Sequence, residues 1–127
     1  MNTKRSLLLF LIILVTKFAI GQDGPRIVVK PEVVDYGTRA NGSDGTSHFH
    51  IFNTGDEPLK IETIYTAHGG MIAKFENGKV LPGDSIEVIL KFDTRRIGPF
   101  STSATVVSNA VNDPAKWVKI KGRILEP

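Results

Sequence analysis

One pair of side chains in the sequence has a spacing that suits a metal ion. His48 and His50 stand two residues apart, and on a β-strand such residues point to the same face. Two imidazoles make half of a zinc site, which needs a third and usually a fourth ligand. Only folding could bring His68 or a carboxylate to that position, so we expect both histidines on a solvated face. Metal binding by this pair stays an alternative, and we expect no cofactor.

A second group of residues, near the C-terminus, combines an aromatic ring with cations. Apolar and polar residues alternate there, as on a half-buried strand. If the apolar residues face inward, four side chains share the outer face: Trp117, Lys119, Lys121 and Arg123. Such a face could contact a peptide, an anionic surface or a sugar ring. The competing interpretation is that the lysines protect an edge strand from pairing with other chains, while Trp117 covers one end of the domain.

A third polar group lies in the stretch FNTGDEPLKI. Its residues, Asn53, Thr54, Gly55, Asp56 and Pro58, form either a ligand site or a turn. Asn53 can hydrogen-bond the backbone two residues on, and Gly55 can adopt positive φ at no steric cost. Pro58 lacks an N–H and suits the edge at which the next strand begins. We therefore predict a structural turn, the corner of a β-hairpin.

No other group of residues indicates catalysis. The chain has no cysteine, which excludes a thiol nucleophile and a thiolate metal site. It has no Gly-x-Ser-x-Gly elbow of the kind that serine hydrolases use, and no phosphate-binding glycine loop. Its carboxylates are scattered, with no pair in a hydrophobic setting that would separate their pKa values. We therefore predict that the protein is not an enzyme.

The segments that carry these residues are predicted strands. Apolar residues recur at every second position in several stretches, and no stretch after residue 22 keeps a helical period. The expected strands are 27–36, 47–52, 59–64, 71–75, 85–92, 100–108 and 118–124. Pro31 splits the first strand, and the apolar face switches near Thr63, as at a β-bulge. With turn signals between them, about seven short strands indicate a single all-β domain, an Ig-like antiparallel β-sandwich.

The N-terminal segment is predicted to be a signal peptide. Basic residues Lys4 and Arg5 precede an unbroken apolar run over 7–15, and small residues at 19 and 21 place cleavage before Gln22. Residues 1–21 would form the signal peptide helix, and 22–127 the mature domain. Lys17 interrupts the apolar run too early for a membrane span, and a bacterial lipid anchor needs a cysteine. We therefore expect export to the periplasm or beyond, with no membrane span and no lipid anchor after cleavage.

Signal cleavage would also change the charge of the protein. The full chain has 16 Lys and Arg against 13 Asp and Glu, a net charge of +3. Lys4, Arg5 and Lys17 would leave with the signal peptide, and 16 minus 3 leaves 13 cations against 13 acids in the mature chain. Because that net charge is zero, the basic precursor gives no reason to expect a nucleic-acid partner.

The ordered set of turn and strand motifs resembles a known family. In chain order the motifs are Val34-Asp35-Tyr36-Gly37, Phe49-His50-Ile51-Phe52-Asn53-Thr54-Gly55-Asp56-Glu57-Pro58-Leu59, Leu81-Pro82-Gly83-Asp84, Phe92-Asp93-Thr94, Gly98-Pro99-Phe100, Val107-Ser108-Asn109-Ala110 and Ile120-Lys121-Gly122. Together they resemble domain-of-unknown-function family 1573, a bacterial Ig-like family related in architecture to MSP-like and ASH-type domains. They run through nearly all of residues 27–125, so the resemblance covers the mature domain. It implies an exported sandwich domain and very little about function.

The chain departs from that family at one place. Family members often carry a Cys-Gly-Cys pair after the strand that follows the turn. This chain reads Ala67-His68-Gly69-Gly70-Met71 there, with His68 and Gly70 at the cysteine positions. Any redox or metal role of such a pair is therefore absent from this protein.

These observations together favour a noncatalytic exported domain that serves as a protein–protein interaction or structural module. Its partner would be an unknown envelope or extracellular protein, bound by β-strand addition to an exposed sheet edge. The alternative is a glycan- or metal-binding module that uses the outer face of the last strand or the His48/His50 pair.

Overall fold

The computed structural model describes residues 24–127. The predicted signal peptide, residues 1–21, and its cleavage site lie outside the described residues. Residues 24–127 form nine strands: β1 (Ile27–Lys30), β2 (Val33–Arg39), β3 (Thr46–Asn53), β4 (Leu59–Thr66), β5 (Met71–Lys74), β6 (Lys79–Val80), β7 (Ser85–Phe92), β8 (Gly98–Ser108) and β9 (Ala115–Ile124). This part of the chain has no helix that is long and apolar enough to cross a membrane.

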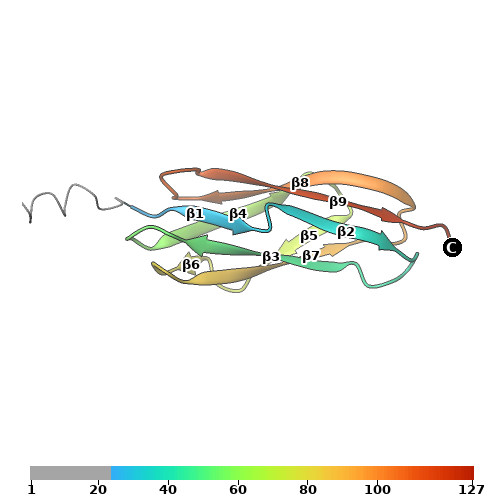
Figure 1. Ribbon diagram of the computed structural model, residues 1–127, viewed down its shortest axis with the longest axis horizontal. Helices are drawn as coiled ribbons and strands as arrows, with labels where there is room; N and C mark the ends of the chain where they lie inside the picture. Colours follow the sequence, from blue (N-terminus) through green and yellow to red (C-terminus); the bar gives the residue numbers. More distant parts are fainter. Residues whose placement is uncertain (1–23) are drawn as a thin grey trace, which may run out of the picture.

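The strands form two sheets that pack face to face in an elongated sandwich (Figure 1). The four-stranded sheet has the order β1-β3-β7-β5, and the five-stranded sheet has the order β2-β9-β8-β4-β6. The all-β sandwich is confirmed. Its nine strands exceed the seven expected because the break at Pro31 places β1 and β2 in different sheets, and because the two-residue β6 gives no periodic signal. The pair β2/β9 is parallel, so the sandwich is not wholly antiparallel.

The core lies between the two sheets and follows the predicted alternation. On β9 the apolar residues Val118, Ile120 and Ile124 are buried, and β3 and β7 contribute their alternate apolar residues in the same way. The pairing of β4 with β8 shifts register between Ile61 and Thr63, which confirms the predicted bulge. Burial of such side chains contributes roughly 1.5–3 kcal/mol each, so the inward faces of the two sheets hold the sandwich together.

The turn after β3 is not the β-hairpin corner that the sequence predicts. β3 belongs to the four-stranded sheet and β4 to the five-stranded sheet, so this turn is an arch between the two layers. The role predicted for Gly55 is also wrong, because it is not among the glycines with positive φ. A Cβ at Gly55 would collide with the backbone of Gly24 and lie 2.7 Å from the Arg26 nitrogen. Glycine is needed there for the close approach of two backbone segments.

Asn53 anchors this arch through its side-chain amide. The residue is 1% exposed. Its Oδ1 accepts hydrogen bonds from the N–H groups of Gly55 (2.9 Å) and Arg26 (3.3 Å). Its Nδ2 donates to the carbonyls of Glu57 (2.7 Å) and Val80 (2.9 Å). Every hydrogen-bonding position of the amide is therefore used within the fold.

Candidate interaction face

The four residues predicted to share an outer face do so. Trp117, Lys119, Lys121 and Arg123 are all exposed and alternate along β9 with its buried residues. β9 lies between β2 and β8 in the five-stranded sheet, so it is a central strand. The interpretation that its lysines protect a sheet edge is therefore wrong. Trp117 is 71% exposed, which also shows that its ring covers little of the domain.

A second aromatic side chain, Tyr65, lies on the same face. Tyr65 on β4 pairs with Thr105 on β8, and Thr105 pairs with Trp117 on β9. Neighbouring strands are about 4.8 Å apart, so the two rings stand on strands roughly 10 Å apart with a hydroxyl between them. Tyr65 is 63% exposed. Sequence reasoning missed this residue, although the face switch near Thr63 was the signal that brings Tyr65 outward.

The cations of this face differ in how far they are neutralised. Lys121 Nζ lies 4.0 Å from Asp35 Oδ2 on β2. Among residues 24–127, no carboxylate lies within ion-pair distance of Lys119 or Arg123. The outer face of β9 therefore carries two cations without an acidic neighbour and one that is shared with Asp35.

A shallow groove of about 460 Å³ runs along this face beside Trp117. Val33 at the start of β2 lines one side and the β8 serines, Ser101 and Ser103, line the other, with Lys119 between them. At the Trp117 end, the Lys116 Nζ lies 3.5 Å from the Glu32 carboxylate. Here we name the outer surface of β9 with its flanking groove and Tyr65 the aromatic–cationic face. It offers apolar surface, hydroxyl groups and positive charge side by side.

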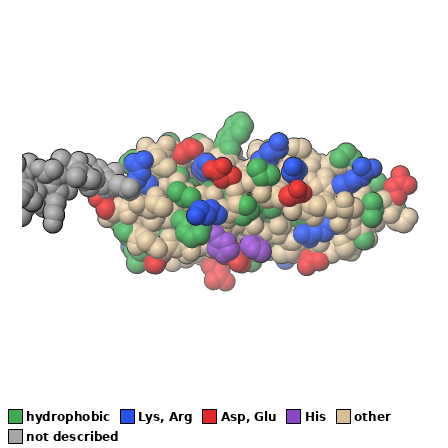
Figure 2. Space-filling model, in the orientation of Figure 1, with side chains coloured by type: hydrophobic (Ala, Val, Ile, Leu, Met, Phe, Trp, Pro, Cys, Tyr) green, Lys and Arg blue, Asp and Glu red, His purple; other side chains and the backbone are tan. Residues whose placement is uncertain are grey.

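The histidine pair lies on the opposite surface of the sandwich. His48 and His50 are neighbours on the outer face of β3, with ring centroids 5.7 Å apart. Figure 2 shows histidine side chains gathered on this surface between basic and acidic ones. The His50 Nε2 lies 3.6 Å from the Glu87 carboxylate, and the Lys30 ammonium lies over the ring of Phe52, next to His50 on this face. These side chains contact one another across the surface.

The third histidine is used in the turn between β4 and β5. The His68 Nδ1 accepts a hydrogen bond from the Gly70 N–H at 3.0 Å, and the ring lies edge-on to Phe92 at 5.3 Å. Within residues 24–127, no group of three or more His, Asp or Glu side chains is placed to hold a metal ion. The pair His48/His50 therefore has Glu87 beside it but no further potential ligand in the described chain.

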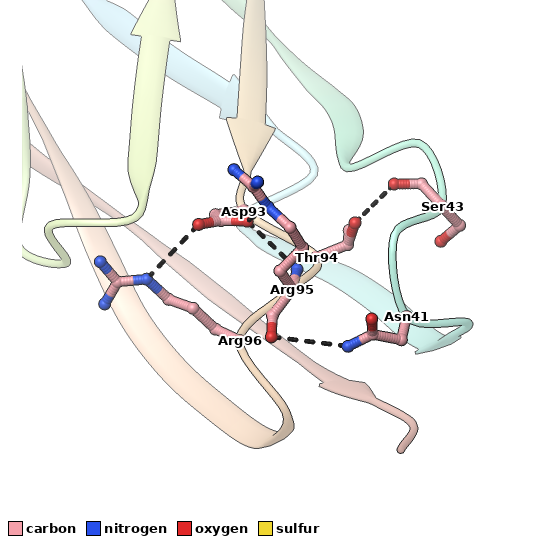
Figure 3. A network of polar contacts seen from close by, with 6 residues as sticks. All are labelled: Asn41, Ser43, Asp93, Thr94, Arg95 and Arg96. Carbon is pink, nitrogen blue, oxygen red and sulfur yellow. Dashed lines mark hydrogen bonds and ion pairs between the residues drawn. The ribbon is translucent and has the colours of Figure 1, made fainter. Parts of the chain in front are cut away.

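A polar cluster at the end of β7 is explained by the turn that it builds (Figure 3). The Thr94 hydroxyl donates to the Ser43 carbonyl at 2.6 Å, and Asn41 Nδ2 reaches the Arg95 carbonyl at 3.5 Å. Asp93 accepts hydrogen bonds from the backbone and side chain of Arg95, and these bonds lower the pKa of its carboxyl. The cluster ties the loop before β3 to the loop after β7, so its polar groups are engaged in holding two loops together.

The edges of both sheets are partly closed by side chains. Along β1, the Asn112 side-chain amide exchanges two hydrogen bonds with the N–H and C=O of Ile27, each 2.9 Å. Along β2, the pairing with β9 shifts register after Asp35, a bulge that bends the strand, and the Arg39 guanidinium donates to the Tyr36 carbonyl at 3.2 Å. At the start of β5, the Thr66 hydroxyl donates to the Met71 carbonyl at 2.9 Å. These contacts leave short stretches of free edge for pairing with another chain.

Comparison with solved structures shows the fold that this arrangement shares. A protein of unknown function from Porphyromonas gingivalis W83 aligns with a TM-score of 0.72 at 17% identity, over 78% of this chain and 46% of that chain. The ASH/PapD-like domain 7 of human CEP192 aligns with a TM-score of 0.67 at 12% identity, over 80% and 87%. WR4, an MSP family member from C. elegans, aligns with a TM-score of 0.53 at 11% identity, over 80% and 99%. This chain therefore spans about half of the P. gingivalis protein.

The sequence itself gives two further results. No curated protein sequence matches the chain. The profile of a family described as "Protein of unknown function (DUF1573)" matches residues 27–124, the same part of the chain that forms the two sheets.

Proposed function

Since the chain belongs to the DUF1573 family of proteins of unknown function, we propose its function from the site: it is a noncatalytic interaction module that binds a protein partner through the aromatic–cationic face. The sandwich of the PapD-like and MSP-like type is compatible with such a role. From the predicted signal peptide, we propose that the module meets its partner outside the cytoplasm, in the periplasm or beyond.

The observation that carries this proposal is the exposure of Trp117 together with Tyr65. Large aromatic side chains on a central part of a sheet bury apolar surface only when another molecule covers them. Trp, Tyr and Arg are the residues that most often dominate binding energy at protein interfaces. The face joins two of these rings to Arg123 on one rigid sheet, so the contact residues are held in place before a partner arrives.

The closure of the sheet edges supports binding by this face over β-strand addition. Strand addition needs a run of free N–H and C=O groups along an edge. On β1 the amide of Asn112 occupies part of that run, and on β2 the bulge and Arg39 interrupt it. The uninterrupted part of β2 is Val33–Asp35, which borders the same face. Strand addition at β2 would therefore be limited to this short stretch and would act together with the face.

A glycan is the second candidate ligand, and Tyr65 is the observation that favours it. Sugar rings stack their apolar C–H surfaces on aromatic rings, and a second aromatic on the same face extends such a platform. The β8 hydroxyls between the two rings could hydrogen-bond sugar hydroxyls. The metal-binding alternative at His48/His50 has less support, because within residues 24–127 no group of three His, Asp or Glu side chains is placed to hold a metal ion.

Photo-crosslinking from two matched positions tests the proposal. A photoreactive amino acid would replace Lys119 on β9 or Lys91 on β7, both exposed residues of central strands in opposite sheets. The full chain would be expressed in its own host and crosslinked in intact cells. We expect a discrete protein adduct from position 119 that is lost when Trp117→Ala is added, and none from position 91. Equal adducts from both positions, or none from position 119, would show that this face does not bind a protein.

A further inference from the structure

The cations of the aromatic–cationic face form a regular ladder. Lys119, Lys121 and Arg123 occupy alternate positions of β9, and a strand rises about 3.3–3.4 Å per residue. Successive cations of the ladder are therefore attached roughly 6.7 Å apart along one line. Another extended chain has the same spacing between its alternate side chains, so a segment that lies along β9 would meet one cation at every second residue.

The surroundings of the ladder supply little negative charge. Asp35 lies 4.0 Å from Lys121. The residues paired with Lys119 on the two neighbouring strands are Val33 on β2 and Ser103 on β8. The neighbours of Arg123 are Thr38 and Pro99. Like charges on neighbouring positions of one face repel each other, although solvent screens them. A ligand with carboxylates at the same spacing would relieve that repulsion and would be steered toward the face.

An apolar anchor point adjoins one end of the ladder. The groove beside Trp117 is bordered by the side chain of Val33, which is 43% exposed, and ends at the ion pair of Lys116 with Glu32. The groove is large enough for a single aliphatic or aromatic side chain of a bound segment. Charge and apolar surface are thus arranged in sequence along β9, with the ring of Trp117 first and the cations after it.

We propose that the partner presents an extended acidic segment, with carboxylates at alternate positions and one apolar side chain in the groove beside Trp117. This inference rests on the function proposed above and names the chemistry of the partner. A neutral glycan would leave Lys119 and Arg123 without counter-charges. Asp35 already shares Lys121, so Lys119 and Arg123 are the two cations left for the carboxylates of the segment.

The fluorescence of Trp117 makes the inference directly testable, because it is the single tryptophan of the chain. The probe is a synthetic peptide with leucine at its start and glutamate at three alternate positions, separated by threonine. Its control is the same peptide with lysine in place of glutamate. We expect the acidic peptide to shift the Trp117 emission in a saturable way and the lysine peptide to leave it unchanged. Raising the salt concentration should weaken binding of the acidic peptide by about tenfold, because salt screens the attraction between exposed charges.

Charge reversal on the two faces provides matched variants. Lys119→Glu with Arg123→Glu should weaken binding of the acidic peptide by at least about tenfold. Lys74→Glu with Lys91→Glu, on the outer face of the other sheet, should leave it unchanged. Circular dichroism would verify that both variants keep the fold. Equal affinity of the two peptides, or unchanged binding after reversal on β9, would overturn the inference.

Two further outcomes separate this inference from the proposed function. Tighter binding of tetragalacturonate than of the acidic peptide would identify an acidic glycan as the ligand and overturn the peptide assignment. A protein adduct from position 119 without any response to the acidic peptide would support the proposed function. It would overturn the inference that the partner presents an acidic segment. A response to the acidic peptide without any crosslinked adduct from position 119 would instead overturn the proposal that this face binds a protein in the native host.

Discussion

Asn53 and Trp117 show two opposite uses of side chains that depart from a simple apolar core. Asn53 is a polar residue 1% exposed, and Trp117 is a large aromatic residue 71% exposed. All hydrogen-bonding positions of the Asn53 side chain are occupied by backbone groups of the arch and of two segments beside it. Trp117 lies on a face with a groove and unpaired cations. The difference supports the proposal that Asn53 contributes to stability and Trp117 to binding, and substitutions can separate the two.

The largest effect is expected for Asn53→Ala. The change would remove the side-chain partner of two N–H groups (Gly55, Arg26) and two C=O groups (Glu57, Val80), and each buried unsatisfied group costs about 1–3 kcal/mol. Because some of these groups lie near solvent, we expect a total loss of about 3–5 kcal/mol in the free energy of unfolding. Urea denaturation followed by circular dichroism measures it. A loss below about 1 kcal/mol would show that the amide network is dispensable.

Gly55→Ala tests the arch from the backbone side. The added Cβ would meet the backbone of Gly24 and Arg26, which are not flexible side-chain ends. Overpacking of this kind typically costs about 1–3 kcal/mol. The same denaturation assay applies, with Gly69→Ala as its control because nothing lies within 4 Å of a Cβ at Gly69. Similar losses for both variants would contradict the close-approach explanation.

The buried phenol of Tyr36 makes the stability of the domain depend on pH. Burial raises the pKa of Tyr36 to about 12 from 10.0, despite the opposing charge of Arg39. The neutral form is favoured in the folded state, so this stability is complete below pH 10 and is lost as the pH rises toward 12. Partial solvent screening limits the effect to about 1–2 kcal/mol. Denaturation at pH 9 and pH 11.5 should show a steeper loss for the wild type than for Tyr36→Phe.

The smallest effect on stability is expected for Trp117→Ala. Substitution of an exposed residue that has no special backbone conformation usually changes the free energy of unfolding by no more than about 0.5 kcal/mol. The same change should weaken partner binding by at least about 30-fold, the loss that corresponds to a 2 kcal/mol interface residue. Denaturation and the crosslinking yield measure the two effects. A large loss of stability without loss of binding would remove the contrast with Asn53.

The local pattern of the sequence predicted which side of each strand faces the core. The alternation on β9 and β3 was sufficient because a period of two has one buried side in a sandwich. It placed Trp117 and the β9 cations outward, and it placed His48 and His50 on a solvated face. The shift at Thr63 also followed from the pattern, although its consequence for Tyr65 did not.

What the pattern lacked was the pairing between distant strands. β9 is central because β2 pairs with it in parallel, and no feature of either segment alone indicates that contact. The arch after Asn53 has the composition of a hairpin turn, because turn residues respond to the local backbone and not to the sheet that the next strand joins. Asn112 likewise reads as a loop residue, while its amide closes the edge of β1, 85 residues away in sequence.

The parallel pairing of β2 with β9 also sets how the domain would carry tension. β2 lies near the start of the described chain and β9 near its end, and the two ends lie at opposite ends of the long axis (Figure 1). Once a pull on both ends has detached β1 from β3, it would slide these parallel strands past each other, so the hydrogen bonds between them would be loaded together instead of opening one after another. A domain stretched between two anchors would yield only when that whole ladder ruptures.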